Sequence, residues 1–185
     1  LAGIYMDSQY FDKALGALGE AKKISPRRQT TDLLLAQIYY YKRDTQKAIE
    51  ILENLTKEGP NIPDPYWFLG ILYESSGDSP NAYVYMKTAV VEHGYTFKSI
   101  SERALYVSVL SKFNDYADME PQYKEMLKEQ GDNPQLWASY ATVCLELKKY
   151  DEARESARQA IFLSPAFGDE GGKFLKKVDA AEAGK

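Results

Sequence analysis

Residues 63–96 read PDPYWFLGILYESSGDSPNAYVYMKTAVVEHGYT, and this stretch decides the fold. Asp64 followed by Pro65 is a helix-start signal, because the missing N–H of a proline costs nothing in the first turn of a helix. Two small residues, Gly70 and Ala82, would let two antiparallel helices cross closely. The stretch therefore predicts a pair of short antiparallel helices.

The same order of side-chain sizes recurs along the chain. The small-residue column of the first helix holds Ala2, Ala36, Gly70, Val107 and Ala141. The matching column of the second helix holds Ala14, Ala48, Ala82, Met119 and Ala153. Both columns advance by one constant interval except at the third step, which is longer in both, so a three-residue insertion lies near 96–99. Within a period, apolar residues recur three and four apart, as in Leu35, Ile38 and Tyr39, which is the period of a helix.

The period divides the chain into helix pairs, each of which can bury its apolar face only against its neighbours. The predicted division is 1–28 for a truncated first repeat, 29–62, 63–96, 100–133 for a degenerate repeat, 134–167, and 168–185 for a capping helix and tail. By this period the first repeat lacks its beginning. We therefore expect the sequence to be a piece of a longer polypeptide.

These residues resemble the signature of the tetratricopeptide repeat family. The resemblance covers nearly the whole chain and is clearest in 134–167, which contains Trp137, Tyr140, Ala141, Tyr150, Ala153, Ala157, Ala160 and Pro165. It implies an all-α solenoid in which antiparallel helix pairs form a right-handed superhelix. It also implies a concave wall, lined by the first helices, that binds a protein or peptide.

One repeat departs from this pattern. In 100–133, Val107 and Met119 replace the small residues, and Pro121 falls within the second helix. An interior proline removes a backbone hydrogen bond. We therefore expect this helix to start late, near Asp118, so that the proline lies in its first turn.

The last segment has the composition of a cap. We expect a loop over 166–172, which includes a Gly-Gly pair, and then a helix with Phe174, Leu175 and Val178 facing inward. Lysines occupy its outward positions. A polar outer face is what the end of a repeat array requires.

Residues that could perform catalysis are sparse. The single histidine, His93, precedes Gly94 at a predicted helix end, where a cation offsets the helix dipole and glycine supplies a left-handed cap. Cys144 falls in a column of large packing residues, so we interpret it as a buried, inert thiol. A single cysteine excludes an internal disulfide and a cysteine-built metal site. The sequence predicts a protein that is not an enzyme and uses no cofactor or metal.

Charge and hydropathy restrict the partners. The chain has 23 basic and 27 acidic residues, giving a net charge of −4, so it has no excess of cations to neutralise phosphates. Nucleic acids and anionic membrane surfaces are therefore disfavoured. No apolar run approaches the roughly 20 residues of a membrane-spanning helix. The compartment stays open between the cytoplasm and an extracytoplasmic space such as the periplasm.

The family register supplies candidate partner-binding residues on the concave wall. They are Leu33, Gln37, Tyr40, Tyr41, Trp67, Ile71, Ser108 and Thr142. In 134–167 the same register also points inward at Gln135, Ala138, Leu145 and Glu146. The first aromatic and aliphatic members would form an exposed apolar cluster, which is typical of an interaction site, and the later hydroxyl residues leave room for a bound segment. Alternatively, Trp67 and Tyr41 pack against the next repeat and belong to the core.

A carboxylate clamp like that of chaperone-binding tetratricopeptide domains is not expected. The corresponding places hold Leu33, Gln37, Phe68, Ser101 and Leu105, which lack the required charge.

Three functional hypotheses follow. The first is an interaction scaffold that binds a peptide or a partner helix in the concave groove. The second rests on a resemblance of residues 96–177 to the tails of bacterial membrane O-antigen ligase or polymerase proteins, and makes the chain a non-catalytic extracytoplasmic accessory domain. The third is self-association through the open N-terminal end.

Overall fold

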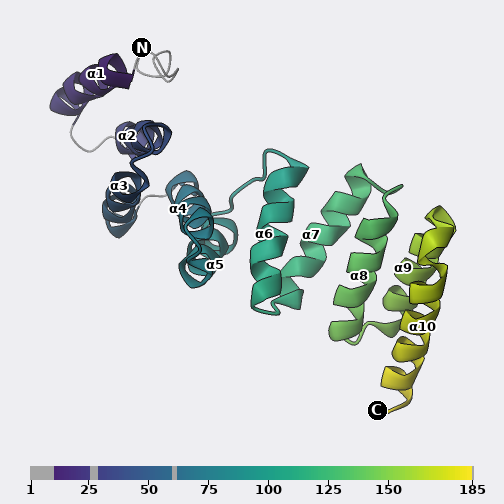
Figure 1. Ribbon diagram of the computed structural model, residues 1–185. Coiled ribbons are helices and arrows are strands. Elements are labelled where there is room, and N and C mark those ends of the chain that lie inside the picture. Colours follow the sequence, from purple (N-terminus) through teal and green to yellow (C-terminus); the bar gives the residue numbers. More distant parts are fainter. Residues whose placement is uncertain (1–10, 26–28, 60–61, 185) are drawn as a thin grey trace. The chain divides into compact units, whose positions relative to one another are not determined.

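The computed structural model describes residues 11–25, 29–59 and 62–184, and the regular structure within these ranges is entirely helical (Figure 1). The all-α prediction is thereby confirmed. The chain divides into two compact units, Leu1–Thr96 and Phe97–Lys185. Residues 1–10, which the sequence places in the truncated first repeat, lie outside the described residues.

In the first unit each described helix packs against the next one along the chain. Its elements are α1 (Phe11–Ile24), α2 (Gln29–Tyr41), α3 (Thr45–Lys57), α4 (Asp64–Ser75) and α5 (Ser79–Lys87), which continues into a π-helical segment, Thr88–Glu92. Gly94 follows in the left-handed conformation, with φ of 67°, as expected for the end of this helix.

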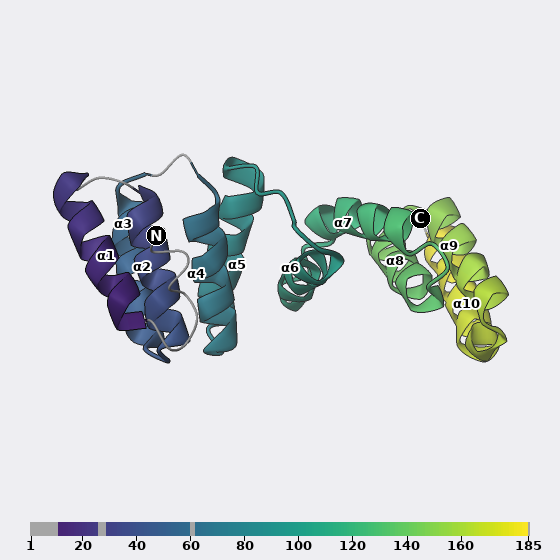
Figure 2. The same ribbon diagram turned by 90° about the horizontal axis from the view of Figure 1, so that it is seen from above.

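The helices of the second unit form two layers. Its elements are α6 (Ile100–Lys112), α7 (Tyr116–Glu129), α8 (Pro134–Glu146), α9 (Tyr150–Leu163), a 3-10 turn (Pro165–Phe167) and α10 (Gly168–Ala183). In Figure 2, α6, α8 and α10 lie on one side of this unit, and α7 and α9 lie on the other. The first helices therefore share one wall, as the sequence pattern predicts.

Four turns between paired helices have the same backbone shape. The second residue after each first helix is left-handed, with φ of 66° at Arg43, 84° at Gly77, 55° at Asn114 and 59° at Lys148. The next residue donates its N–H to a carbonyl five positions earlier, with N···O distances of 2.9, 2.9, 3.1 and 2.8 Å. This is the Schellman arrangement that satisfies the last carbonyls of a helix. The turns recur at the spacing of the small-residue columns, with the same longer step between Gly77 and Asn114, so the backbone repeats with the sequence.

In three of these turns, the residue that donates this N–H also caps the second helix with its side chain. The carboxylates of Asp44, Asp78 and Asp115 accept backbone N–H bonds of 3.1, 3.2 and 3.4 Å from the third residue of the next helix. The fourth turn has Lys149 at this place and no side-chain cap. Its ammonium group instead binds both carboxylate oxygens of Glu120 on α7, at 2.6 and 2.7 Å.

The small-residue columns lie at the helix crossings. Ala36, Ala48, Ala82 and Ala153 are fully buried. A Cβ added at Gly70 would lie 2.3 Å from Cγ of Met86, so α4 and α5 can approach only because this residue is glycine. The columns thus mark the closest contacts within each pair.

The start of α7 corrects one expectation. The helix begins at Tyr116 and not near Asp118, and Pro121 lies inside it. The left-handed Asn114 and the cap at Asp115 set the start at the same place as in the other repeats. The proline removes one hydrogen bond, to the carbonyl of Ala117, but both residues are exposed, so water can satisfy that carbonyl.

The expected loop over 166–172 is also wrong, because α10 already begins at Gly168. A Cβ at Gly171 would lie 2.6 Å from the side chain of Ile161, so this glycine permits close packing of α10 on α9. Val178 is fully buried, whereas the lysines of α10 are exposed, as predicted for a cap. Among the described residues, no helix is long and apolar enough to cross a bilayer.

Candidate functional site

A half-open pocket of about 280 Å³ lies in the second unit, where α8, α9 and α10 meet. Its lining consists of Gln135, Ala138, Ser139, Ala141, Thr142, Ala157, Ala160, Phe167, Glu170, Gly171 and Phe174. The alanines are small because α8 and α9 cross there. Their short side chains leave the space, and the rings of Phe167 and Phe174 bound it.

Four of the lining side chains are polar, those of Gln135, Ser139, Thr142 and Glu170. Thr142 is exposed, and its hydroxyl donates to the carbonyl of Ala138 at 3.2 Å. Gln135 is exposed at the start of α8, where Asn133 caps the helix by accepting its backbone N–H at 3.0 Å. Glu170, in the first turn of α10, is the single formally charged lining residue. The pocket is therefore apolar at its base, with an acidic group from one wall.

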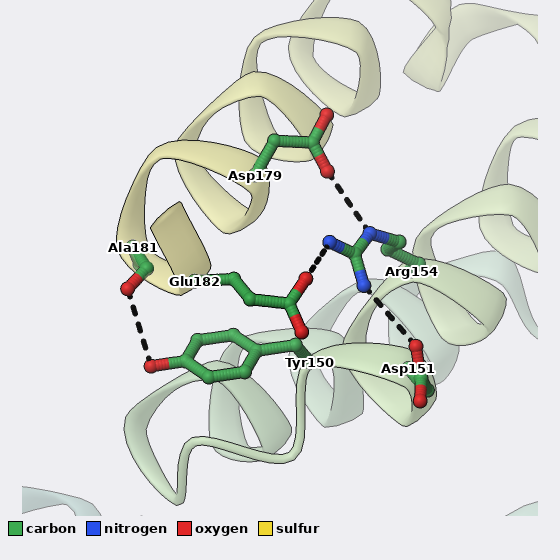
Figure 3. Close-up of polar contacts among 6 residues, drawn as sticks. All are labelled: Tyr150, Asp151, Arg154, Asp179, Ala181 and Glu182. Carbon is green, nitrogen blue, oxygen red and sulfur yellow. Dashed lines mark hydrogen bonds and ion pairs between the residues drawn. The ribbon is translucent and has the colours of Figure 1, made fainter. Parts of the chain in front are cut away.

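The wall formed by α10 is fixed to α9 at the far end of the helix (Figure 3). The guanidinium of Arg154 donates from Nε to Asp179 at 2.9 Å and from Nη1 to Asp151 at 3.2 Å, and also binds Glu182. The hydroxyl of Tyr150 donates to the carbonyl of Ala181 at 3.4 Å. These contacts hold α10 in place from α9 without entering the pocket.

Only some of the partner-binding residues predicted in the second unit line the pocket. Thr142 lines the pocket, as do Gln135 and Ala138 from the same register. Ser108 is exposed on α6 but does not line the pocket. Three of the five register places on α8 therefore line the pocket, and Leu145 and Glu146 do not.

The other side of the pocket was missed by the sequence reasoning. Phe167, Glu170 and Phe174 come from the segment that was expected to be a loop and a cap. A signal was present, because Phe174 follows Tyr140, and Val178 follows Cys144, at the regular interval of the small-residue columns. This continued period predicts that α10 stacks as one further first helix.

In the first unit, aromatic rings form a chain on α1, α2 and α4. Tyr41 is 54% exposed and stacks on Phe11 with ring centroids 6.4 Å apart. Tyr40 is half-buried and meets Tyr41 at 5.8 Å and Phe68 edge-on at 5.6 Å. The predicted partner-binding residues Leu33, Gln37 and Ile71 are also half-buried.

Trp67 does not belong to an exposed cluster, contrary to the binding interpretation of this residue. Its side chain is 3% exposed, and its ring stacks on Tyr95 with centroids 4.5 Å apart and planes 16° apart. A helix in a stacked array must bury one of its faces, and the Trp67 indole belongs to the buried face of α4. The packing alternative therefore describes Trp67, whereas Tyr41 remains available at the surface.

Cys144 and His93, the two residues considered for catalysis, each contact an aromatic side chain. Cys144 is fully buried and shares a hydrogen bond with the hydroxyl of Tyr140, and burial raises the pKa of its thiol. The His93 ring stacks on Tyr66 with centroids 4.4 Å apart. In the part of the chain that the structure describes, no three His, Cys, Asp or Glu side chains are grouped to hold a metal ion.

Two curated relatives match most of this chain. BBSome complex member BBS4 of Bos taurus is 26% identical over 161 residues, which cover 87% of this chain and 30% of the relative. The BBS4 homologue of Drosophila melanogaster is 24% identical over 142 residues, covering 76% of this chain and 29% of the relative. The chain thus spans less than a third of the length of these relatives.

Solved structures show the same fold. The structure of YrrB, described as a TPR protein with an unusual peptide-binding site, matches with a TM-score of 0.60 and 15% identity, covering 93% of this chain and 88% of that one. The Naa15/Naa10 complex bound to HypK-THB matches with a TM-score of 0.67 and 17% identity, covering 85% of this chain and 23% of that one. The predicted solenoid fold is confirmed, while the division into individual repeats stays a prediction.

A family model described as "Tetratricopeptide repeat" matches residues 33–91 and 107–166, which together are well over half of the sequence. These ranges contain the four left-handed turns and most of the small-residue columns. The chain belongs to the tetratricopeptide repeat family.

Proposed function

We propose that this chain is a non-catalytic scaffold whose second unit binds an extended peptide segment, with the pocket between α8, α9 and α10 as its anchoring point. Tetratricopeptide proteins are generally non-catalytic interaction scaffolds, and the curated relatives are named as members of a multiprotein complex. The chain's role in any particular assembly is part of the proposal.

One observation carries the proposal. The concave register that the family resemblance supplies has five places on α8, and three of them, Gln135, Ala138 and Thr142, line the pocket. A cavity of about 280 Å³ admits a long side chain with a short piece of backbone, but it lies below the usual size of a site for a drug-sized ligand. This is the size expected of a peptide subsite.

The flanking surface suits an extended chain. Ser101, Ala104 and Ser108 on α6 are exposed and small, and they occupy the register places that Gln135, Ala138 and Thr142 occupy on α8. Small side chains let a peptide backbone approach a helix closely. The pocket would fix one side chain, and this surface would hold the residues beside it.

Filling the pocket tests the proposal. A random peptide library displayed on phage is selected against the whole chain and against Thr142→Trp, whose indole would occupy the pocket from its rim. Enrichment is expected for the wild-type chain and lost in the variant. The matched control is Ala117→Trp, because Ala117 is exposed on α7 in the other layer of the same unit. Equal enrichment by all three proteins would refute the pocket as the anchoring point.

The two other hypotheses remain predictions. The accessory-domain hypothesis requires hydrophobic membrane spans elsewhere in the same polypeptide, which the gene sequence upstream of Leu1 would reveal. Self-association requires a concentration-dependent sedimentation coefficient, which analytical ultracentrifugation would measure.

A further inference from the structure

The geometry points to an arginine side chain of the bound peptide as the occupant of the pocket between α8, α9 and α10, with its guanidinium at Glu170 and its aliphatic stem on the alanine floor. This inference rests on the proposed function and specifies its partner. It is argued from the charge, shape and surface chemistry of the lining.

The charge of the lining selects a cation. Glu170 is exposed, and among the residues that the structure describes it has no ion-pair partner. The lysines of α10 do not line the pocket. The Glu170 carboxylate would repel an acidic peptide residue. A purely apolar residue would cover part of this carboxylate without giving it a hydrogen-bond or ion-pair partner. A basic residue satisfies the carboxylate while its stem fills the apolar base.

The shape of the lining favours arginine over lysine. Gln135 at the start of α8 and Glu170 at the start of α10 provide two oxygen acceptors from different walls, and a guanidinium has five donors in a fixed plane. Phe167 and Phe174 also line the pocket, and aromatic rings attract a guanidinium through cation–π contacts. An ammonium group is a compact point charge that uses less of this surface.

The same unit already holds one of its own arginines with these residue types. The guanidinium of Arg103 lies over the ring of Phe97, 4.6 Å from its centroid, and donates to Oε1 of Gln122 at 2.6 Å. A phenylalanine face and a glutamine oxygen can therefore contact one guanidinium together in this fold. The pocket offers both of these groups and adds a carboxylate.

The test uses defined tripeptides and the whole chain. ¹H–¹⁵N spectra are titrated with Ac-Ala-Arg-Ala-NH₂ and with the matching lysine, leucine and glutamate peptides. The arginine peptide is expected to shift the amides of Gly171 and Thr142 in a saturable way and to bind most tightly. Glu170→Gln is expected to weaken it about two- to five-fold, the size of effect for one exposed ion pair.

Asp169→Asn is the matched control. Asp169 is also exposed and acidic in the first turn of α10, so the variant loses the same charge and the same helix-dipole contact, but Asp169 does not line the pocket. Its affinity for the arginine peptide should stay within measurement error of the wild-type value.

Three outcomes overturn the inference. They are binding of the lysine, leucine or glutamate peptide at least as tightly as the arginine peptide, equal weakening by both variants, and no saturable shift with any peptide. These results differ from a failure of the proposed function, in which Thr142→Trp leaves library selection unchanged. Selected peptides that need the pocket but lack a basic anchor would keep the function and reject arginine.

Discussion

Buried and exposed rings of the first unit can be told apart by single substitutions. Trp67 is 3% exposed and stacked on Tyr95, whereas Tyr41 is 54% exposed. Trp67→Ala should lower the free energy of unfolding by about 3–5 kcal/mol, the usual cost of deleting a large core ring. Tyr41→Ala should cost less than about 1 kcal/mol. Thermal melting followed by circular dichroism measures both, and equal shifts would contradict the assignment of Trp67 to the core.

The left-handed turn residues provide a second comparison at the same scale. Lys148 has φ of 59° and an exposed side chain, and its Cβ makes this conformation unfavourable. Lys148→Gly should raise the free energy of unfolding by about 0.5–1 kcal/mol, because the relief of strain exceeds the added entropy of the unfolded chain. Gly77→Ala, at the equivalent turn, should lower it by a similar amount. Urea midpoints that move in the same direction for both variants would exclude this explanation.

Helix α7 is joined to the turn between α8 and α9 by a carboxylate that titrates. Lys124 and Lys149 hold the pKa of Glu120 below its ordinary value of 4.5, through Nζ–oxygen distances of 2.6 Å each. A lowered folded-state pKa means that the stabilisation is present above about pH 4.5 and is lost as the pH falls through the folded value. The wild-type urea midpoint should therefore drop more steeply between pH 5 and about pH 3 than that of Glu120→Gln. Equal slopes for the wild-type chain and Glu120→Gln would contradict this role of the ion pairs.

Helix α10 is attached at one end by the ion pairs of Arg154 and by the hydrogen bond of Tyr150 to Ala181. Arg154 binds Asp179 and Glu182 of α10, whereas Arg158, on the same helix α9, is exposed and forms no ion pair among the described residues. Arg154→Leu should speed hydrogen exchange of the α10 amides around Val178 at least several-fold and leave those of α8 unchanged, because local opening reports local contacts. Arg158→Leu should leave both unchanged. Unaltered exchange in α10 after the Arg154 substitution would show that apolar packing alone holds this helix.

At the scale of the whole molecule, the sequence predicted the repeated parts well and the end of the array poorly. Ala36, Gly70 and Ala141 repeat because small residues let paired helices cross closely, so a periodic pattern was available to find them, although Val107 interrupts it. The start of α10 was missed because a Gly-Gly pair is typical of a loop, and the contact of Gly171 with Ile161 that explains it is tertiary. The sequence could not decide whether Trp67 binds a partner on the concave wall or packs in the core, because both roles place an aromatic ring at the same register position.

The two compact units lead to a prediction about independent folding. Repeat arrays are stabilised by contacts between neighbouring helices, so a unit with its own buried residues needs no distant part of the chain. In Phe97–Lys185, Tyr140, Cys144 and Val178 pack together in one cluster. Residues 97–185 expressed alone should therefore give a helical circular dichroism spectrum with a cooperative melt, and should bind the arginine tripeptide as the whole chain does. A disordered spectrum from this fragment would mean that its core is completed by residues 1–96.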